Sequence, residues 1–292
     1  MALNKATRNL ALAGLDKEKR ASAAKGVVGL TGVMTIYNLM NSGNVAVTKT
    51  EGVFSVIEHE TDLSLSSPLE AVQQYFMKAQ GMRKRQLLAN LNNQGIILQN
   101  GAMQWIAGSI TISADIKGFG DLVGKTFRGK VTGESAVNPL YRGTGTIFCE
   151  PTYKHLVLRH IQEGAGLVIK DGLFLACTDT LAITLVAAKS LANLAGQGLF
   201  NLAIRGNGVV ALECPIPEEE IIRVDISEGE EIRVDGPFAL MWEEGLSFTV
   251  ERSSRTLLGS AASGEGLVNV FRGRGSVWLA TASAGVKPTV LG

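Results

Sequence analysis

The chain has 292 residues, of which 46% are hydrophobic and 19% charged, and its formal net charge is +1. This composition suits a soluble globular protein with a sizeable core, and the balanced charge excludes a global attraction to nucleic acid or to anionic membranes. Glycine is abundant at 34 residues and proline scarce at 7, as expected where tight turns join short strands. Cys149, Cys177 and Cys214 lack paired spacing, so we expect buried reduced thiols and a cytoplasmic location.

Residues 1–44 form an N-terminal helical and apolar extension. Residues 4–24 predict a polar, weakly amphipathic helix, and neither a secretion signal nor a membrane-spanning run is evident. The segment that follows, residues 26–40, is called the arm here, and it is more apolar than a free tail should be in water. It is expected to contact a neighbouring subunit, with its own domain or a membrane as alternatives, through Val27, Val28, Leu30, Val33, Met34, Ile36, Leu39 and Met40.

Residues 45–292 are expected to form one β-domain made of three copies of a single pattern. The copies start at Gly133, Gly196 and Gly264, and each reads Gly, Glu or Gln, a small residue, two apolar residues and Asn. Each then ends in an apolar residue followed by Arg-Gly-x-Gly, which predicts a turn. An Asn-Gly or Asp-Gly pair also recurs between apolar runs and predicts a hairpin with positive φ at the glycine. These three glycines are Gly101, Gly172 and Gly236.

An inserted helix is predicted near residues 68–81. Ser67-Pro68-Leu69-Glu70 has the spacing of a capping box with proline in the first turn, and Gly81 can end the helix. Leu69, Val72, Phe76 and Ala79 fall on one helical face. We expect this apolar stripe to pack on the β-domain or on a partner.

The repeated pattern resembles the altered inheritance of mitochondria protein twenty-four family over roughly residues 45–286. The most specific matching stretches are residues 101–105, 132–135, 171–176, 264–268 and 271–279. The resemblance implies an all-β fold, a three-fold internally repeated double-stranded β-helix like that of the tryptophan RNA-binding attenuator protein. It implies no catalytic residues. Eukaryotic members act in mitochondrial inner-membrane organisation, but this chain has no evident Arg-rich transit peptide, so that role does not carry over directly.

No pattern predicts a catalytic, metal or cofactor site. His155 and His160 are five residues apart on one strand and therefore point to opposite faces, so the histidines, His59 included, are expected to be structural or exposed. The glycine-rich residues 118–126 lack the spacing of a phosphate loop. Three arginines occupy equivalent positions in the repeated pattern and are the strongest candidates for a site. We expect each to form structural bonds to carbonyls or to a glutamate of a neighbouring copy, such as Glu134 or Glu265, and an anion-binding ring is the alternative. The three arginines are Arg142, Arg205 and Arg272.

These features favour a non-enzymatic scaffold or interaction protein that self-associates as a homo-oligomer. A small-ligand or RNA-binding module is the first alternative, although aromatic residues make up only 6% of the chain and no stacking platform for nucleic acid is evident. A peripheral membrane-organising protein is the second alternative, through the apolar arm and the basic residues that follow the inserted helix.

Overall fold

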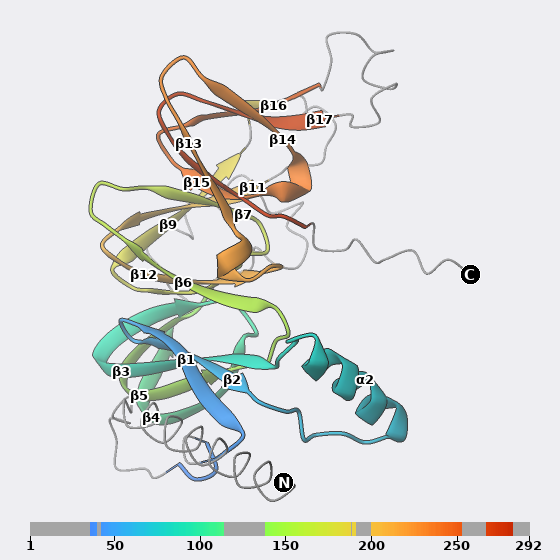
Figure 1. Cartoon of the computed structure of the whole chain (residues 1–292). Coiled ribbons are helices and arrows are strands. Elements are labelled where there is room, and N and C mark those ends of the chain that lie inside the picture. The colour runs from blue at the N-terminus through green and yellow to red at the C-terminus, as the bar shows by residue number, and fades with distance from the viewer. Residues whose placement is uncertain are drawn as a thin grey trace, which may run out of the picture. The chain divides into compact units, whose positions relative to one another are not determined.

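The structure, a computed structural model, describes residues 36–39, 42–113, 138–187, 189–190, 200–252 and 267–282. These residues are mostly β-strand, and α2 (Pro68–Ala79) is the one α-helix among them (Figure 1). The all-β class and the inserted helix are therefore confirmed. The expected helix over residues 4–24 lies outside the described residues.

The chain divides into two compact units, of which the first comprises Met1–Gln94, Met103–Ile110 and Gly143–Tyr153. In this unit β1 and β2 form an antiparallel hairpin, β2 pairs with β3, and β5 pairs with both β3 and β4. Apolar side chains of these strands build a small core around Ile57, Leu88 and Phe148. The strands are β1 (Val45–Glu51), β2 (Phe54–His59), β3 (Arg85–Leu98), β4 (Met103–Ser113) and β5 (Leu140–Cys149).

The second unit contains Gly95–Ala102, Thr111–Arg142 and Lys154–Gly292, so β3, β4 and β5 contribute residues to both units. Its strands are β6 (His155–Ile161), β7 (Leu167–Lys170), β8 (Phe174–Thr178), β9 (Leu181–Ala187), β10 (Lys189–Ser190), β11 (Phe200–Gly206), β12 (Gly208–Cys214), β13 (Ile222–Ile226), β14 (Glu231–Asp235), β15 (Ala239–Glu243), β16 (Ser247–Arg252), β17 (Leu267–Arg272) and β18 (Gly275–Leu279). Two short 3-10 helices also belong to this unit, η2 (Glu218–Glu220) and η3 (Gly236–Phe238).

Three strand arrangements make up the second unit. The end of β3 pairs with β8, which continues through β12 to β6. One further sheet has the order β13-β18-β15-β7-β11-β9, and the other has the order β10-β16-β17-β14. Their inner faces enclose two apolar cores, one that includes Ile169, Leu212 and Trp278, and one that includes Trp242 and Phe271. Burial of these large side chains is the main stabilising term for the strands.

The Asx-Gly pairs form turns, but none of them joins two paired strands. The turn at Asp171-Gly172 leads from β7, which pairs with β11 and β15, to β8, which pairs with β3 and β12. Gly101 and Gly172 have the expected positive φ, at 80° and 79°. Gly236 does not, because Pro237 follows and the chain enters the 3-10 helix η3 instead. The hairpin prediction was therefore wrong, since each flanking run pairs with a strand from elsewhere in the chain.

The three Arg-Gly-x-Gly elements differ from one another in structure. The second joins β11 to β12 and the third joins β17 to β18, as turns do. The first, residues 142–145, lies inside the continuous strand β5, so the turn prediction was wrong there. Its glycines are needed for close approach, because a Cβ on Gly143 or Gly145 would overlap a carbonyl oxygen of β4.

The apolar arm enters the described part of the chain at Ile36. Leu39 is buried against Ile57, Leu88 and Phe148, and Ile36 packs beside them, so these two arm residues contact the core of their own unit. Val27, Val28, Leu30, Val33, Met34 and Met40 lie outside the described residues. Within the described ranges, no helix is both long and apolar enough to cross a membrane.

Candidate functional site

Helix α2 begins as its sequence predicts. The Ser67 hydroxyl accepts a hydrogen bond from the Glu70 main-chain N–H at 3.3 Å, and the Glu70 carboxylate accepts one from the Ser66 main-chain N–H at 2.7 Å. These bonds satisfy amide groups that have no partner within the helix, and they place a negative charge at the positive end of the helix dipole. Gly81, with φ of 74°, follows the last turn. The helix is thus fixed locally.

The polar face of α2 points toward its own unit. Gln74 Nε2 donates to the Tyr153 hydroxyl at 2.9 Å, and that hydroxyl donates to Asp62 Oδ2 at 2.8 Å. Lys84 Nζ lies 2.8 Å from Asp62 Oδ1. The hydrogen bond of Gln74 therefore attaches the inner face of the helix to its own unit.

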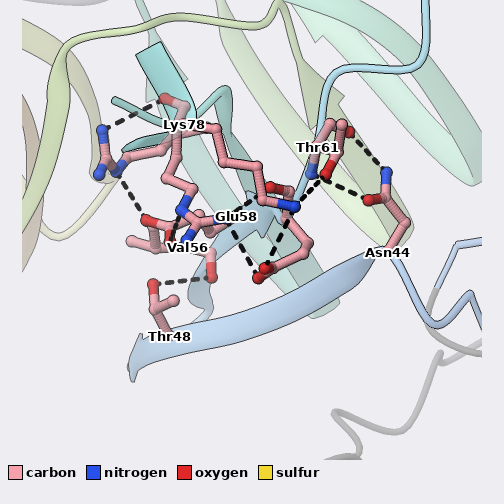
Figure 2. A network of polar contacts seen from close by, with 9 residues as sticks. Asn44, Thr48, Val56, Glu58, Thr61 and Lys78 are labelled. Atoms are coloured by element: carbon pink, nitrogen blue, oxygen red, sulfur yellow. Dashed lines mark hydrogen bonds and ion pairs between the residues drawn. The ribbon is translucent and has the colours of Figure 1, made fainter. Parts of the chain in front are cut away.

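The end of α2 joins a wider polar network (Figure 2). Lys78 Nζ donates to the Thr61 hydroxyl at 2.8 Å and lies 3.7 Å from Glu60. Asn44 bonds the Thr61 backbone twice, because its amide donates to the carbonyl at 2.7 Å and its Oδ1 accepts from the N–H at 2.9 Å. Figure 2 shows these side chains gathered beside β1 and β2. The segment after the arm, the loop before α2 and the helix itself are thus tied together.

Basic side chains around this network are already paired. Arg83 lies 3.1 Å from Glu60, and Arg85 Nε donates to Glu58 at 3.0 Å. Burial would raise the pKa of Asp62, but hydrogen bonds from Lys84, the Ser64 backbone and Tyr153 outweigh it and lower that pKa to about 2. Asp62 is consequently charged at neutral pH.

The apolar stripe of α2 lies in water. Leu69, Val72 and Phe76 are 67%, 54% and 62% exposed, and Tyr75 beside them is 72% exposed. No residue of the helix is buried. The expectation that this stripe packs on the β-domain was wrong, because Gln74 and Lys78 on the other face make the contacts instead. Adjacent exposed apolar side chains of this kind are a common feature of contact surfaces.

Arg142 and Arg205, two of the three arginines that the sequence pattern aligns, have similar surroundings in the second unit. Arg142 pairs with Asp179, whose main-chain N–H donates to the Gly95 carbonyl at 3.0 Å. Arg205 Nε donates to Glu244 at 2.6 Å, and the Glu244 N–H donates to the Gly166 carbonyl at 2.9 Å. In both clusters a Cβ on the glycine would overlap the carboxylate side chain. We call these two groups the Arg–acid clamps, residues 95, 142 and 179 and residues 166, 205 and 244.

Arg272 is paired differently. Its Nε donates to Glu231 at 2.8 Å and its Nη1 donates to Glu251 at 2.7 Å. The hydrogen bond from Arg272 is the largest cause that lowers the pKa of Glu251, to about 2. Glu134 and Glu265, the acids expected from the sequence, lie outside the described residues. Each of the three arginines is thus engaged with a carboxylate, and the proposed anion-binding ring would have to displace these pairs.

The other chemically reactive side chains have structural surroundings. His59 shares a 2.7 Å hydrogen bond with Gln86, and within the described ranges no cluster of His, Cys, Asp and Glu is arranged to hold a metal ion. The three cysteines are buried and are not joined in disulfides. Burial raises the pKa of the Cys214 thiol to about 12, which makes it a poor nucleophile. The phosphate-loop-like residues 118–126 lie outside the described residues.

Sequence reasoning missed the residues that orient α2 and close the clamps. Tyr153 is 91 residues from Asp62 and 79 from Gln74, and no local spacing links them. Asp179 and Glu244 carried a weak signal, since they lie eight and nine residues after the aspartate of an Asp-Gly pair. The offset becomes meaningful only once Arg142 and Arg205 are known to pair with these two acids.

The described residues define a class, namely a β-sheet protein with repeated Arg–acid clamps and one outward-facing amphipathic helix. The model of the AIM24 mitochondrial biogenesis family matches residues 77–282, and the chain belongs to that family. A Streptococcus pyogenes protein known from its X-ray crystal structure is similar in fold, with a TM-score of 0.51 and 21% identity. That similarity covers 69% of this chain and 89% of the other. Among curated proteins, none matches.

Proposed function

We propose that this chain is a non-enzymatic scaffold and interaction protein that presents α2 to another protein. The observation that carries the proposal is the orientation of the helix, with its polar face bonded to Tyr153 and Thr61 and its apolar stripe in water. The capping bonds of Ser67 and Glu70 hold the helix formed without a partner, which reduces the ordering cost of binding.

A protein partner fits the charges better than an anionic membrane does. Lys78, Arg83 and Lys84 each pair with a carboxylate, which leaves little positive charge near the stripe to attract anionic lipid. Amphipathic helices that bind such membranes carry lysine and arginine along the polar face. Here that face is turned inward.

The three-copy organisation with the attenuator-protein-like β-helix belongs to the same proposal. The Asn of each copy is buried, at Asn138, Asn201 and Asn269. Asn138 accepts a bond from the Asn100 N–H at 3.2 Å, and Asn269 donates to the Gly236 carbonyl at 3.5 Å, so in two copies the Asn side chain bonds the backbone of the Asx-Gly turn, as acceptor in one and as donor in the other. These contacts and the two Arg–acid clamps support equivalence of the copies.

The proposal is tested in fresh extracts of the cells that make the protein. The size of the native species that contains the full-length chain is compared with that of the purified protein. We expect a larger species in the extract, which shrinks to the purified size in the variant Leu69→Gln with Phe76→Gln. The matched control, Ile222→Gln, changes an exposed apolar residue of the second unit and should leave the large species intact.

An extract species of the same size as the purified protein would overturn the proposal. Flotation of the purified protein with neutral or anionic vesicles, lost in the stripe variant, would also overturn it in favour of membrane contact. An oligomer of the purified wild-type protein that dissociates in the stripe variant would identify the docking partner as a second copy of this chain. Self-association, which the sequence favours, would then take the place of the proposed contact with another protein.

A further inference from the structure

We infer that α2 is a groove ligand: Leu69, Val72 and Phe76 are three anchors that enter an apolar groove of a partner protein. This inference rests on the proposed function and specifies the partner. The anchors are spaced i, i+3 and i+7, which is the register in which an amphipathic helix inserts into a hydrophobic groove. The 12 residues of α2 span about 18 Å, so the groove is about three helical turns long.

The small size of the surface favours a groove over a flat contact. A specific flat interface uses roughly 20–30 residues on each side. Helix α2 offers four exposed large apolar side chains, at positions 69, 72, 75 and 76, and the segments on either side add Leu63, Leu65 and Met82, still far fewer residues than a flat interface uses. A short helix reaches useful affinity when the walls of a groove cover its flanks as well as its stripe, because each anchor is then fully removed from water.

The stripe also specifies an uncharged groove. The two charged residues of α2 are Glu70 and Lys78. Glu70 is held by Ser66, and Lys78 lies against Glu60 and Thr61 on the inner face. Neither charge lies on the stripe, and that of Lys78 is paired with Glu60, so binding should depend mainly on apolar burial and change little between low and moderate salt. Tyr75, whose ring meets Phe76 edge-on with centroids 5.5 Å apart, is placed for the rim of the groove.

The flanks of the helix provide the test. A photo-crosslinking amino acid, p-benzoylphenylalanine, is introduced into the full-length chain in its own cells at Val72 on the stripe, or at Gln73 or Tyr75 on the two flanks. Ile222 serves as an exposed control position in the second unit. A groove predicts one adduct of the same mass at all three helix positions and none at Ile222. The adduct should persist at moderate salt and disappear when Leu69→Gln and Phe76→Gln are added.

The outcomes separate the two proposals. An adduct at Val72 alone, or one of twice the chain's own mass, would overturn the groove inference while leaving docking through the stripe in place. The absence of any intermolecular protein adduct at all three helix positions would overturn both. A crosslink within one chain, between position 72 and the arm at residues 26–34, would also overturn both, because the arm would then be the occupant.

Discussion

The Gln74 side chain of α2 donates a hydrogen bond to the Tyr153 hydroxyl, 79 residues further along the chain. Tyr153 in turn donates to Asp62 in the loop before the helix. One hydroxyl therefore links the inner face of α2 to two other parts of its unit. This relationship sets which face of the helix meets water.

Removal of that hydroxyl should loosen α2. In Tyr153→Phe the Gln74 amide loses its acceptor and Asp62 loses one donor, so we expect a loss of about 1 kcal/mol in the free energy of unfolding. Amide hydrogen exchange should speed up over residues 69–79 more than elsewhere. Tyr37→Phe, at an exposed tyrosine, is the control and should change neither quantity. Unaltered exchange in α2 would show that Tyr153 does not hold the helix.

Acid should weaken the same attachment. Because the pKa of Asp62 is lowered to about 2 in the folded protein, from a usual value near 4, its charge stabilises the fold above about pH 4. That stabilisation, about 1 kcal/mol after allowance for solvent screening, is lost as the pH falls from 4 toward 2. Denaturant unfolding of wild type and Asp62→Asn should differ by a constant amount above pH 5 and converge below pH 4. A difference that stays constant down to pH 2 would rule out this role.

The sequence predicted the bounds of α2 but not its orientation. Capping by Ser67 and Glu70 is a local interaction, so spacing alone reveals it. Orientation depends on Tyr153 and Thr61, which face Gln74 and Lys78 only in the folded chain. An apolar stripe normally faces the core, and here the inner positions are satisfied by polar bonds instead.

A similar limit applies to the β-strands. The β-rich class was predictable, because abundant glycine and scarce proline are expected where tight turns join short strands. The Asx-Gly pairs correctly placed two positive-φ turns, because that backbone conformation favours glycine regardless of context. They did not reveal strand partners, since Leu167–Lys170 pairs with β11 and β15 rather than with the strand after the turn. Strand pairing is a long-range property that turn chemistry alone does not determine.

The Arg–acid clamps predict a specific sensitivity at their glycines. In Gly166→Ala the new methyl group meets the Glu244 carboxylate, which must leave Arg205 to make room. We expect a loss of about 1–2 kcal/mol in the free energy of unfolding, measured by chemical denaturation. Gly245→Ala, where a Cβ would meet nothing within 4 Å, should cost under about 0.5 kcal/mol. Equal effects at the two glycines would contradict the clamp.

The three Asx-Gly turns should respond unequally to alanine. Gly101→Ala and Gly172→Ala place a Cβ at positive φ and should each cost about 1 kcal/mol of stability. Gly236→Ala should be nearly neutral, because η3 uses an ordinary backbone conformation there. Thermal and denaturant unfolding of the three variants give the comparison. A large loss at Gly236 would mean that its turn resembles the other two after all.

The outward orientation of the α2 stripe is the central claim, and thiol labelling of the purified protein tests it most directly. The native cysteines are buried, so they contribute little background. A single cysteine is introduced as Val72→Cys on the exposed face or as Gln74→Cys on the inner face. The structure predicts that Val72→Cys reacts at the rate of a free thiol and Gln74→Cys several-fold more slowly. Slow labelling at position 72 with fast labelling at position 74 would contradict the account, because the apolar face would then be packed inward.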